Sequence, residues 1–254
     1  MEQDLKIALV KRLKQVGAYD VRVADPRIGF EHALEDKHPL VFWPACKSIV
    51  VYSVPTSPET NNTYIGPYSV WDGDRDLGPV PNNLVSSEYA LTRLSQLFMS
   101  SVTLKGLLFL QNKGYETRHP EIEIQLKLCA YEAGLGVYGR SGLILHPELG
   151  NRMILGAILT NALLEPDPPL ENSSPCKDCS ICIKGCPAHA YDPSKEYPDS
   201  WSKAKCMAKR EEILKKGLFC HNCFAACPAG RLKDDELFLK REAVSFYRRK
   251  RDGG

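Results

Sequence analysis

Eight of the ten cysteines in this 254-residue chain lie in its C-terminal third, at spacings that suit metal ligands. The first four follow the pattern C-x2-C-x2-C-x3-C-P: Cys176, Cys179, Cys182 and Cys186, with Pro187 after the last. The other four are Cys206, Cys220, Cys223 and Cys227, again with a proline, Pro228, after the last. This pattern is typical of iron–sulfur proteins with two [4Fe–4S] clusters, which need eight thiolates. It predicts a protein that transfers electrons.

The spacing also predicts how the eight thiolates are shared. Three thiolates on a tight loop can bind three corners of one cluster, whereas the fourth lies about one helical turn further on and binds the other cluster. The predicted ligands of the first cluster are therefore Cys176, Cys179, Cys182 and Cys227. Those of the second cluster are Cys186, Cys206, Cys220 and Cys223. Ligands crossed in this way hold the two clusters close together.

The alternative for these cysteines is a pair of zinc sites with four cysteines each, because zinc also prefers sulfur. Zinc ribbons usually separate two C-x2-C pairs by a longer stretch, whereas here three cysteines recur at three-residue intervals and two are followed by proline. We therefore favour clusters over zinc. Cys46 and Cys129 stand outside the pattern, in apolar surroundings, and are interpreted as buried small hydrophobic residues.

Composition places limits on the rest of the protein. Hydrophobic residues make up 43% and charged residues 25%, which is ordinary for a globular protein with a core. A formal charge of +2 gives no general signal for nucleic acid. The charged N-terminus argues against a secretory signal, and no stretch approaches the roughly 18 apolar residues of a membrane span. We expect a cytoplasmic location without membrane contact, where ten cysteines point to metal or catalysis instead of disulfides.

The elements that must position the cysteines begin with an amphipathic helix over 5–16, ended by Gly17. Short apolar runs predict strands over 19–23, 48–54 and 152–163. Helical patterns cover 86–110, with an expected break near Ser100 and Ser101, and 122–133. Residues 55–83 are rich in Pro, Gly, Asn and Asp and predict a long loop.

A proline-rich linker over 165–175 divides the chain. Before it, alternating helices and strands predict an α+β or α/β domain over 1–165. After it we expect a small helical, ferredoxin-like module with both clusters over 166–230. A basic tail over 231–254 follows, interpreted as a solvated amphipathic segment.

A resemblance to a known family rests on CAYEAGLGVYGRSGLILHPELGNRMILGAILTNAL, residues 129–163, which leads into the cysteine pattern. The stretch is similar to the A-G-L-G-x-x-G-K-x-x-L-L segment of the epoxyqueuosine reductases, which precedes the same eight cysteines. The reductive dehalogenases resemble the chain more distantly. The similarity extends more loosely back to PACKSIVVYSVP (44–55) and to the N-terminal helix, and so covers most of the chain.

The resemblance implies a nitroreductase-like α/β domain that binds cobalamin, which the two clusters supply with electrons. By position it places six residues at the corrinoid: Gly134, Gly136, Tyr138, Gly139, Arg140 and Ser141. Glycine suits a close approach of the backbone to a large ligand. Arg140 stands where the family has lysine and is expected near a polar corrin substituent. From the residues alone, such glycines are more often a helix end followed by a turn.

Two departures from the family bear on the substrate. The region that carries a proposed proton-donating aspartate in the epoxyqueuosine enzymes reads Thr117-Arg118-His119-Pro120-Glu121 here. His119 is the candidate acid, with an exposed loop histidine as the other interpretation. The family's C-terminal helical-repeat extension is also missing after Arg231. Both differences argue against tRNA as a partner and favour a small molecule or a corrinoid as substrate.

The leading hypothesis is a reductase that takes electrons from ferredoxin or flavodoxin, through the clusters, to cobalamin. The alternatives are an electron relay that binds flavin or a partner protein, and a reductase that processes corrinoids for another enzyme. The residues do not identify the substrate.

Overall fold

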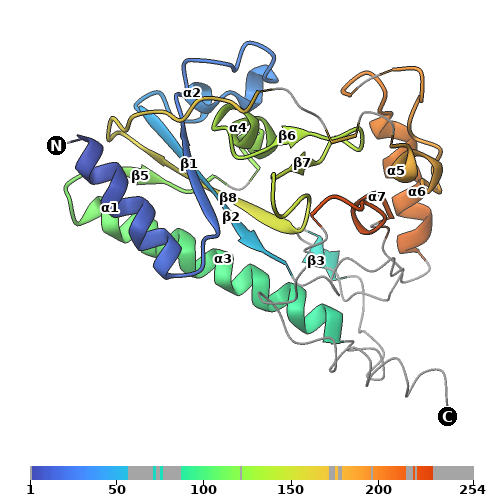
Figure 1. Cartoon of the computed structure of the whole chain (residues 1–254), viewed down its shortest axis with the longest axis horizontal. Helices are drawn as coiled ribbons and strands as arrows, with labels where there is room; N and C mark the ends of the chain where they lie inside the picture. The colour runs from blue at the N-terminus through green and yellow to red at the C-terminus, as the bar shows by residue number, and fades with distance from the viewer. Residues whose placement is uncertain are drawn as a thin grey trace.

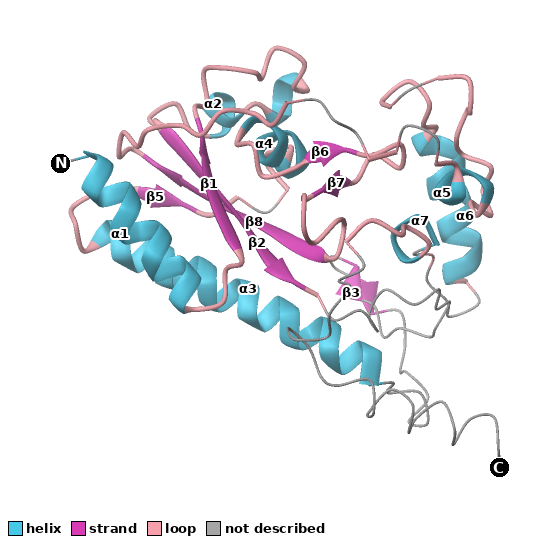
Figure 2. Cartoon of the chain, in the orientation of Figure 1, coloured by secondary structure: helices cyan, strands magenta, loops and turns pink. Residues whose placement is uncertain are grey.

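The computed structural model describes residues 2–56, 71–72, 75–76, 87–120, 122–171, 175–176, 179–195, 197–215, 220 and 222–230. A four-stranded sheet forms its centre, in the order β1-β2-β8-β5 with all neighbours antiparallel. The strands are β1 (Asp20–Ala24), β2 (Ser48–Pro55), β8 (Met153–Thr160) and β5 (Thr117–Arg118). Helices cover both faces of this sheet (Figures 1 and 2), so the fold is mixed α/β.

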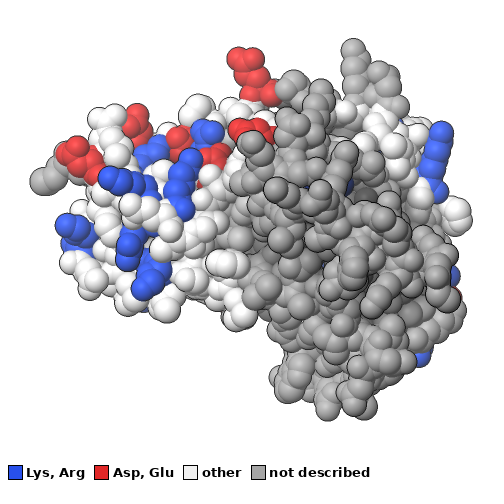
Figure 3. Space-filling model, turned by 60° about the horizontal axis from the view of Figure 1, so that its bottom comes forward, with Lys and Arg blue, Asp and Glu red and all other residues white. Residues whose placement is uncertain are grey.

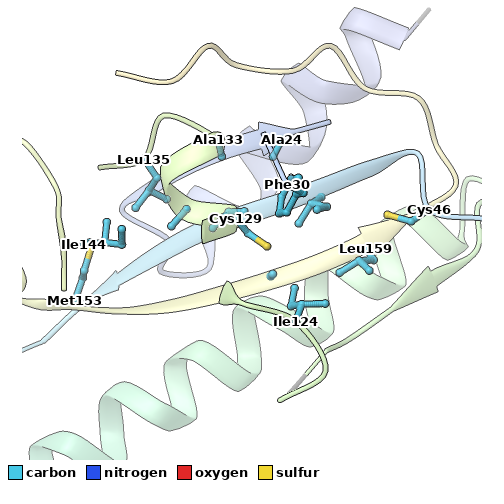
Figure 4. Close-up of a cluster of buried hydrophobic side chains, with 14 of the residues drawn as sticks. Ala24, Phe30, Cys46, Ile124, Cys129, Ala133, Leu135, Ile144, Met153 and Leu159 are labelled. Atoms are coloured by element: carbon cyan, nitrogen blue, oxygen red, sulfur yellow. The ribbon is translucent and has the colours of Figure 1, made fainter. Parts of the chain in front are cut away.

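The strands form where apolar, β-branched residues run together, as in SIVVYSVP of β2. Successive side chains of a strand point to opposite faces. Val50 and Tyr52 thus pack with α1 (Glu2–Gln15) and α3 (Ser87–Gln111). Ile49 and Val51 pack on the other face with α4 (Leu126–Glu132). This second cluster also contains Cys129 (Figure 4).

The predicted strands over 19–23, 48–54 and 152–163 are confirmed as β1, β2 and β8. The first helix is confirmed too, and Gly17 follows its end with a φ of 113°, a conformation that favours glycine. The break predicted in the long helix is wrong, because α3 continues through Ser100 and Ser101. Both serines face outward, where a helix tolerates them.

The helix predicted over 122–133 is shorter than expected. Residues 122–124 form bends and α4 begins only at Leu126. Ala133 ends the helix, and Gly134 follows with a φ of 68°. The sheet has two further antiparallel companions: β6 (Val137–Tyr138) with β7 (Ile144–Leu145), and β3 (Trp71–Asp72) with β4 (Arg75–Asp76).

Four short elements complete the described structure: the 3-10 helix Glu35–Lys37, α2 (Pro39–Phe42), α5 (Ile181–Lys184) and α7 (Asn222–Ala225), besides the longer α6 (Lys203–Leu214). The predicted loop over 55–83 is described only at 55–56, where Pro55 ends β2, and at β3 and β4; its other residues lie outside the described structure, as does the tail over 231–254. In the part described, no helix is long and apolar enough to cross a membrane.

The segment predicted as a linker packs along the first strand. The Asp167 N–H donates to the carbonyl oxygen of Val23 over 2.8 Å, and its carboxylate accepts from the Val23 N–H and from Lys6 Nζ, each over 2.8 Å. The division into domains at this segment stays a prediction. The nitroreductase-like and ferredoxin-like descriptions of the two parts are likewise predictions.

Candidate metal centre

The segment after the linker brings the cysteines together on three helices. Cys182 lies on α5, Cys206 on α6 and Cys223 on α7. Ser202 caps α6, because its side chain accepts a hydrogen bond from the Lys205 N–H over 3.4 Å. Asn222 Nδ2 donates to the carbonyl oxygen of Gly185 over 3.2 Å and so fixes the start of α7 beside the end of α5. Figure 1 shows these helices together at the end of the molecule opposite the N-terminus.

Four thiols from separate places in the sequence surround one small space. A cavity of about 40 Å³ is lined by Cys186, Cys206, Cys220 and Cys223. We call these the second cysteine group. They are the four residues that the spacing assigns to the second cluster. Burial raises the pKa of Cys223, and the neighbouring Cys220, Cys206 and Cys186 raise it further, while a hydrogen bond from Tyr191 lowers it.

The remaining four thiols are the first cysteine group: Cys176, Cys179, Cys182 and Cys227. Cys176 packs against Cys227, and the four thiols affect one another's pKa. Burial raises the pKa of Cys182 to about 11, and Cys176, Cys227 and Cys179 act in the same direction. The pKa of Cys227 is raised chiefly by burial and also by Cys176 and Cys179. Cys223 of the second group also raises the pKa of Cys182, so the two groups lie next to each other.

The donor sets fit iron–sulfur clusters by their chemistry. Each group offers four thiols, the number that one [4Fe–4S] cluster requires. Thiols whose pKa is raised by burial carry their protons at neutral pH, so binding a metal must release those protons. Within the described ranges, no three His, Cys, Asp or Glu side chains are placed as ligands of a single metal ion.

The glycine segment of 137–145 is a hairpin whose tip lies against the cysteine segment. The tip closes by hydrogen bonds from the Gly139 N–H to the Leu143 carbonyl and from the Gly142 N–H to the Gly139 carbonyl, each over 2.8 Å. The Tyr191 hydroxyl donates to the Ser141 carbonyl over 3.1 Å. The predicted site residues Gly139, Arg140 and Ser141 therefore face the segment that carries the cysteines.

Two arginines reach the first cysteine group. Arg140 Nη1 donates to the Cys179 carbonyl over 3.2 Å, and its Nη2 to the Pro193 carbonyl over 3.0 Å. Arg152 Nη2 donates to the Cys227 carbonyl over 3.2 Å. The Nη1 and Nη2 atoms of Arg140 thus both donate to main-chain oxygens near the cysteines. The contact of Arg140 with a corrin substituent stays a prediction.

The three glycines predicted at the corrinoid leave no room for a Cβ, because other parts of the chain lie against them. A Cβ at Gly134 would lie 2.1 Å from the Pro168 carbonyl oxygen, and one at Gly136 would lie 2.6 Å from the Ile144 side chain. A Cβ at Gly139 would lie 2.8 Å from Leu145. These contacts account for the glycines without a ligand. The contact of these glycines with a corrinoid stays a prediction.

A second cavity of about 360 Å³ adjoins the second cysteine group. It is lined by Cys206, Cys220 and Cys223, by Ser141 and Leu143 of the hairpin, by Lys127 and Arg210, and by Tyr191, Tyr197, Trp201 and Phe224. The predicted site residue Tyr138 lies beside this wall, stacked on Tyr197 with ring centroids 5.2 Å apart. The volume is at the low end of the range of about 300–1,000 Å³ for small-molecule pockets.

His119 is not among the residues that line either cavity. Its Nδ1 lies 3.2 Å from the Ala157 carbonyl oxygen of β8, and the residue as a whole is exposed. The structure thus leaves the acid role of His119 a prediction and fits the alternative of an exposed loop histidine.

Sequence reasoning missed three residues that contact the cysteine segments. Besides Arg152, Asn151 Nδ2 donates to the Phe224 carbonyl over 2.8 Å. Burial raises the pKa of Cys206, and a hydrogen bond from the Trp201 side chain opposes this rise. None of these residues belongs to a spaced motif. The one available signal for Arg152 was a charged residue at the edge of an apolar strand.

Comparison with known proteins identifies relatives, although no family model matches the chain. The epoxyqueuosine reductase of Staphylococcus aureus is 29% identical over 153 residues, covering 51% of this chain and 39% of that protein. The enzyme of Synechococcus is 47% identical over 64 residues, or 19% of its length. A tetrachloroethene reductive dehalogenase of Desulfitobacterium hafniense is 28% identical over 147 residues, or 26% of its length. The chain thus spans less than half of these relatives.

Solved structures share the fold. The epoxyqueuosine reductase of Bacillus subtilis, with its catalytic aspartate loop swung out, superimposes on 93% of this chain and 68% of its own, with a TM-score of 0.61 at 21% identity. A catabolic reductive dehalogenase reaches a TM-score of 0.67 at 18% identity, over 90% of this chain and 32% of its own. Another dehalogenase structure concerns a B12-dependent reaction.

One expectation is wrong. The sequence argued against tRNA, yet an epoxyqueuosine reductase with a modified tRNA-Tyr stem loop superimposes on 91% of this chain with a TM-score of 0.60. The fold shared with the tRNA-bound enzyme extends over nearly all of this chain, so the two differences from the family do not exclude tRNA. The chain is a relative of the epoxyqueuosine reductases, with a more distant relation to the reductive dehalogenases.

Proposed function

We propose that this protein is an iron–sulfur oxidoreductase whose two cysteine groups each hold one [4Fe–4S] cluster. The first cluster takes Cys176, Cys179, Cys182 and Cys227, and the second takes Cys186, Cys206, Cys220 and Cys223. When bound, such clusters supply one-electron transfer at low potential. The chain's own part is to hold them side by side and to surround them with buried side chains and hydrogen-bond donors.

The observation that carries this proposal is the crossing of the cysteines. Cys186 stands four residues after Cys182, yet it lines a cavity with Cys206, Cys220 and Cys223. Cys227, from the second half of the motif, neighbours Cys176 and Cys179 instead. This exchange of the last cysteine of each run is the arrangement expected of paired clusters. Separate zinc sites would have no need of it.

We further propose a corrinoid as the electron acceptor, with the cobalt cofactor supplying reductive chemistry that side chains cannot. The support is the relation to the reductases, including the dehalogenases with B12-dependent dehalogenation. Contacts within the chain account for the described glycines, which therefore do not add to this support. An epoxyqueuosine-modified tRNA stem loop is the first substrate to test, and an organohalide the second.

The first experiment is anaerobic purification with reconstitution by iron and sulfide. We expect about eight iron atoms per chain, since each cluster carries four, and paramagnetic-resonance signals of two interacting clusters after reduction. Titration with hydroxocobalamin then tests the corrinoid by its visible absorption. Colourless protein with stoichiometric zinc would overturn the cluster assignment, and absence of cobalamin binding would overturn only the corrinoid.

The second experiment tests the crossed ligands. Cys186→Ala and Cys206→Ala should remove the same cluster signal, and Cys176→Ala and Cys227→Ala should remove the other. Cys129→Ala, which changes a core cysteine, is the matched control and should keep about eight iron atoms. If Cys186→Ala removed the same signal as Cys176→Ala, the crossed arrangement would be wrong.

A further inference from the structure

The helix that carries Cys206 presents basic side chains around this predicted ligand. Residues three or four apart share a face of a helix, so Lys203, Lys209 and Arg210 lie on the face of Cys206. Lys209 and Arg210 line the small cavity of the second cysteine group. Positive charge is therefore placed directly at the second cluster site.

The two acids of α6 neutralise only part of this charge. Glu212 pairs with Lys209 at 2.7 Å and Glu211 with Lys215 at 3.5 Å. Lys203 and Lys205 are exposed, and the described structure contains no ion pair for either. They lie on different sides of the helix, so the first turn of α6 carries positive charge on two sides.

The second cysteine group is also the one that the cavities reach. Three of its thiols, Cys206, Cys220 and Cys223, line the larger cavity of about 360 Å³ as well as the smaller one. No member of the first group lines either of these cavities. Figure 1 shows α6 at the outer edge of the molecule, away from the sheet. A partner on α6 would therefore lie nearest the second cluster.

An apolar side chain accompanies the charges. Met207 on α6 is 47% exposed and lies four residues after Lys203, on the same side of the helix. An exposed methionine among charged residues is typical of a protein-binding surface, which has an apolar centre and a polar rim. Phosphate binding would require the charges but would gain nothing from Met207.

We propose that the exposed part of α6, with Lys203, Lys205 and Met207, is the docking surface for an acidic, low-potential electron-carrier protein. This inference rests on the proposed function, because it presupposes a cluster at the second cysteine group. In the step, the carrier loses one electron and the cluster protein gains one; no bond forms or breaks and no proton is required. Opposite charges on the two surfaces steer the encounter and orient the carrier.

The test uses the full, cluster-loaded chain and a plant-type [2Fe–2S] ferredoxin as the carrier. Reduction of the clusters is followed by stopped-flow absorption in wild type and in Lys203→Glu/Lys205→Glu. We expect the second-order rate to fall about tenfold or more at low ionic strength, and the difference to shrink as salt screens the charges. The matched control is Lys11→Glu/Arg12→Glu on α1, at the end of the molecule where Figure 3 shows a group of Lys and Arg side chains. It changes the net charge equally and should leave at least half of the wild-type rate.

Dithionite, which needs no docking surface, separates the possible failures. If dithionite reduces the clusters of every variant alike and only the α6 variant is slow with ferredoxin, the proposal is supported. If the α6 variant is as fast as wild type, or the α1 control is as slow as the α6 variant, the docking surface is wrong while the clusters stand. If the α6 variant instead loses affinity for a modified tRNA stem loop and keeps its ferredoxin rate, the surface binds RNA. Absence of reducible clusters in wild type would overturn the proposed function itself.

Discussion

Arg152 donates a hydrogen bond from Nη2 to the main-chain carbonyl oxygen of Cys227, over 3.2 Å, from the start of the central strand β8. The residue is only 7% exposed, so its guanidinium is a buried positive charge beside the first cysteine group. It acts on Cys227 by lowering the pKa of a thiol that burial raises. A charge that favours the thiolate also favours added negative charge on anything the thiolate binds.

Removing this charge should therefore make the first cluster harder to reduce. Arg152→Gln keeps a hydrogen-bond donor and loses the charge. We expect the midpoint potential of one cluster to fall by on the order of 50 mV, which is about a tenfold change in a one-electron equilibrium. A redox titration followed by paramagnetic resonance measures this shift.

Arg152→Lys is the matched control, because lysine keeps the charge and changes the shape. Its potential should stay near that of wild type. Equal shifts in both variants would show that Arg152 acts only through packing.

At Gly150 the main chain passes too close to Ala229, in the segment of Cys227, to leave room for a side chain. A Cβ at Gly150 would lie 2.1 Å from the Ala229 carbonyl oxygen, and the φ of Gly150 is 58°. Gly150→Ala should therefore push apart two stretches of main chain and lower both the free energy of unfolding and the iron content. We expect a loss of about 2–4 kcal/mol, from strain in the backbone plus overpacking.

Gly114→Ala separates these two causes. Gly114 has a φ of 85°, yet a Cβ there would meet nothing within 4 Å. This control should lose only about 1 kcal/mol, from the backbone strain, and should keep its iron. Denaturant unfolding and iron analysis of both variants decide the matter, and equal losses would contradict the contact.

The sequence could predict the elements that depend on local pattern. The apolar run of 48–54 predicts β2, and the cysteine spacings predict the two cysteine groups. Both patterns lie within short stretches of sequence. The break at Ser100 and Ser101 was wrong because propensity is a weak guide where a helix is held by its other face. There Val102 and Leu110 are fully buried.

The neighbours of the glycines could not be predicted, because they come from distant parts of the chain. A Cβ at Gly142 would lie 2.3 Å from the ring of Tyr197, and a Cβ at Gly134 would lie 2.1 Å from the carbonyl oxygen of Pro168. A glycine signals a close approach, and the sequence alone does not say to what. The same holds for Arg140, whose partners Cys179 and Pro193 follow it by 39 and 53 residues.

Cys129 should behave as a core residue and not as a ligand. It is fully buried among the side chains of the cluster in Figure 4, and burial raises the pKa of its thiol far above the ordinary value. Cys129→Ser introduces a hydroxyl there, so we expect the free energy of unfolding to fall by about 1–3 kcal/mol. Cys129→Ala should cost less, because it adds no polar atom. Iron content should stay unchanged in both variants, and loss of iron would contradict this assignment.

The fold stabilises the ionised form of Asp20. Burial tends to raise its pKa, but hydrogen bonds from His146 and Arg22 outweigh burial and lower the pKa to about 2. Arg22 Nε lies 2.9 Å from Asp20 Oδ2. The Nδ1 of His146 accepts the Glu148 and Leu149 N–H groups over 3.1 and 3.2 Å, so its proton is on Nε2, which faces Asp20.

A carboxylate whose pKa is lowered on folding stabilises the protein above its unfolded pKa of about 4, and this contribution is lost as the pH falls towards 2. Asp20→Asn should therefore reduce the free energy of unfolding by about 1–2 kcal/mol, an amount already reduced for screening by solvent. The loss should be equal at pH 7 and pH 5, because Asp20 is ionised at both, and denaturant unfolding measures it. Asp36→Asn, at an ion pair with Lys37 whose acid is 75% exposed, is the control and should change little. The loss should shrink as the pH falls from 5 towards about 3, because the unfolded state then takes up the proton first. No loss at pH 7, or a loss that stayed unchanged below pH 5, would mean that folding does not lower the pKa of Asp20.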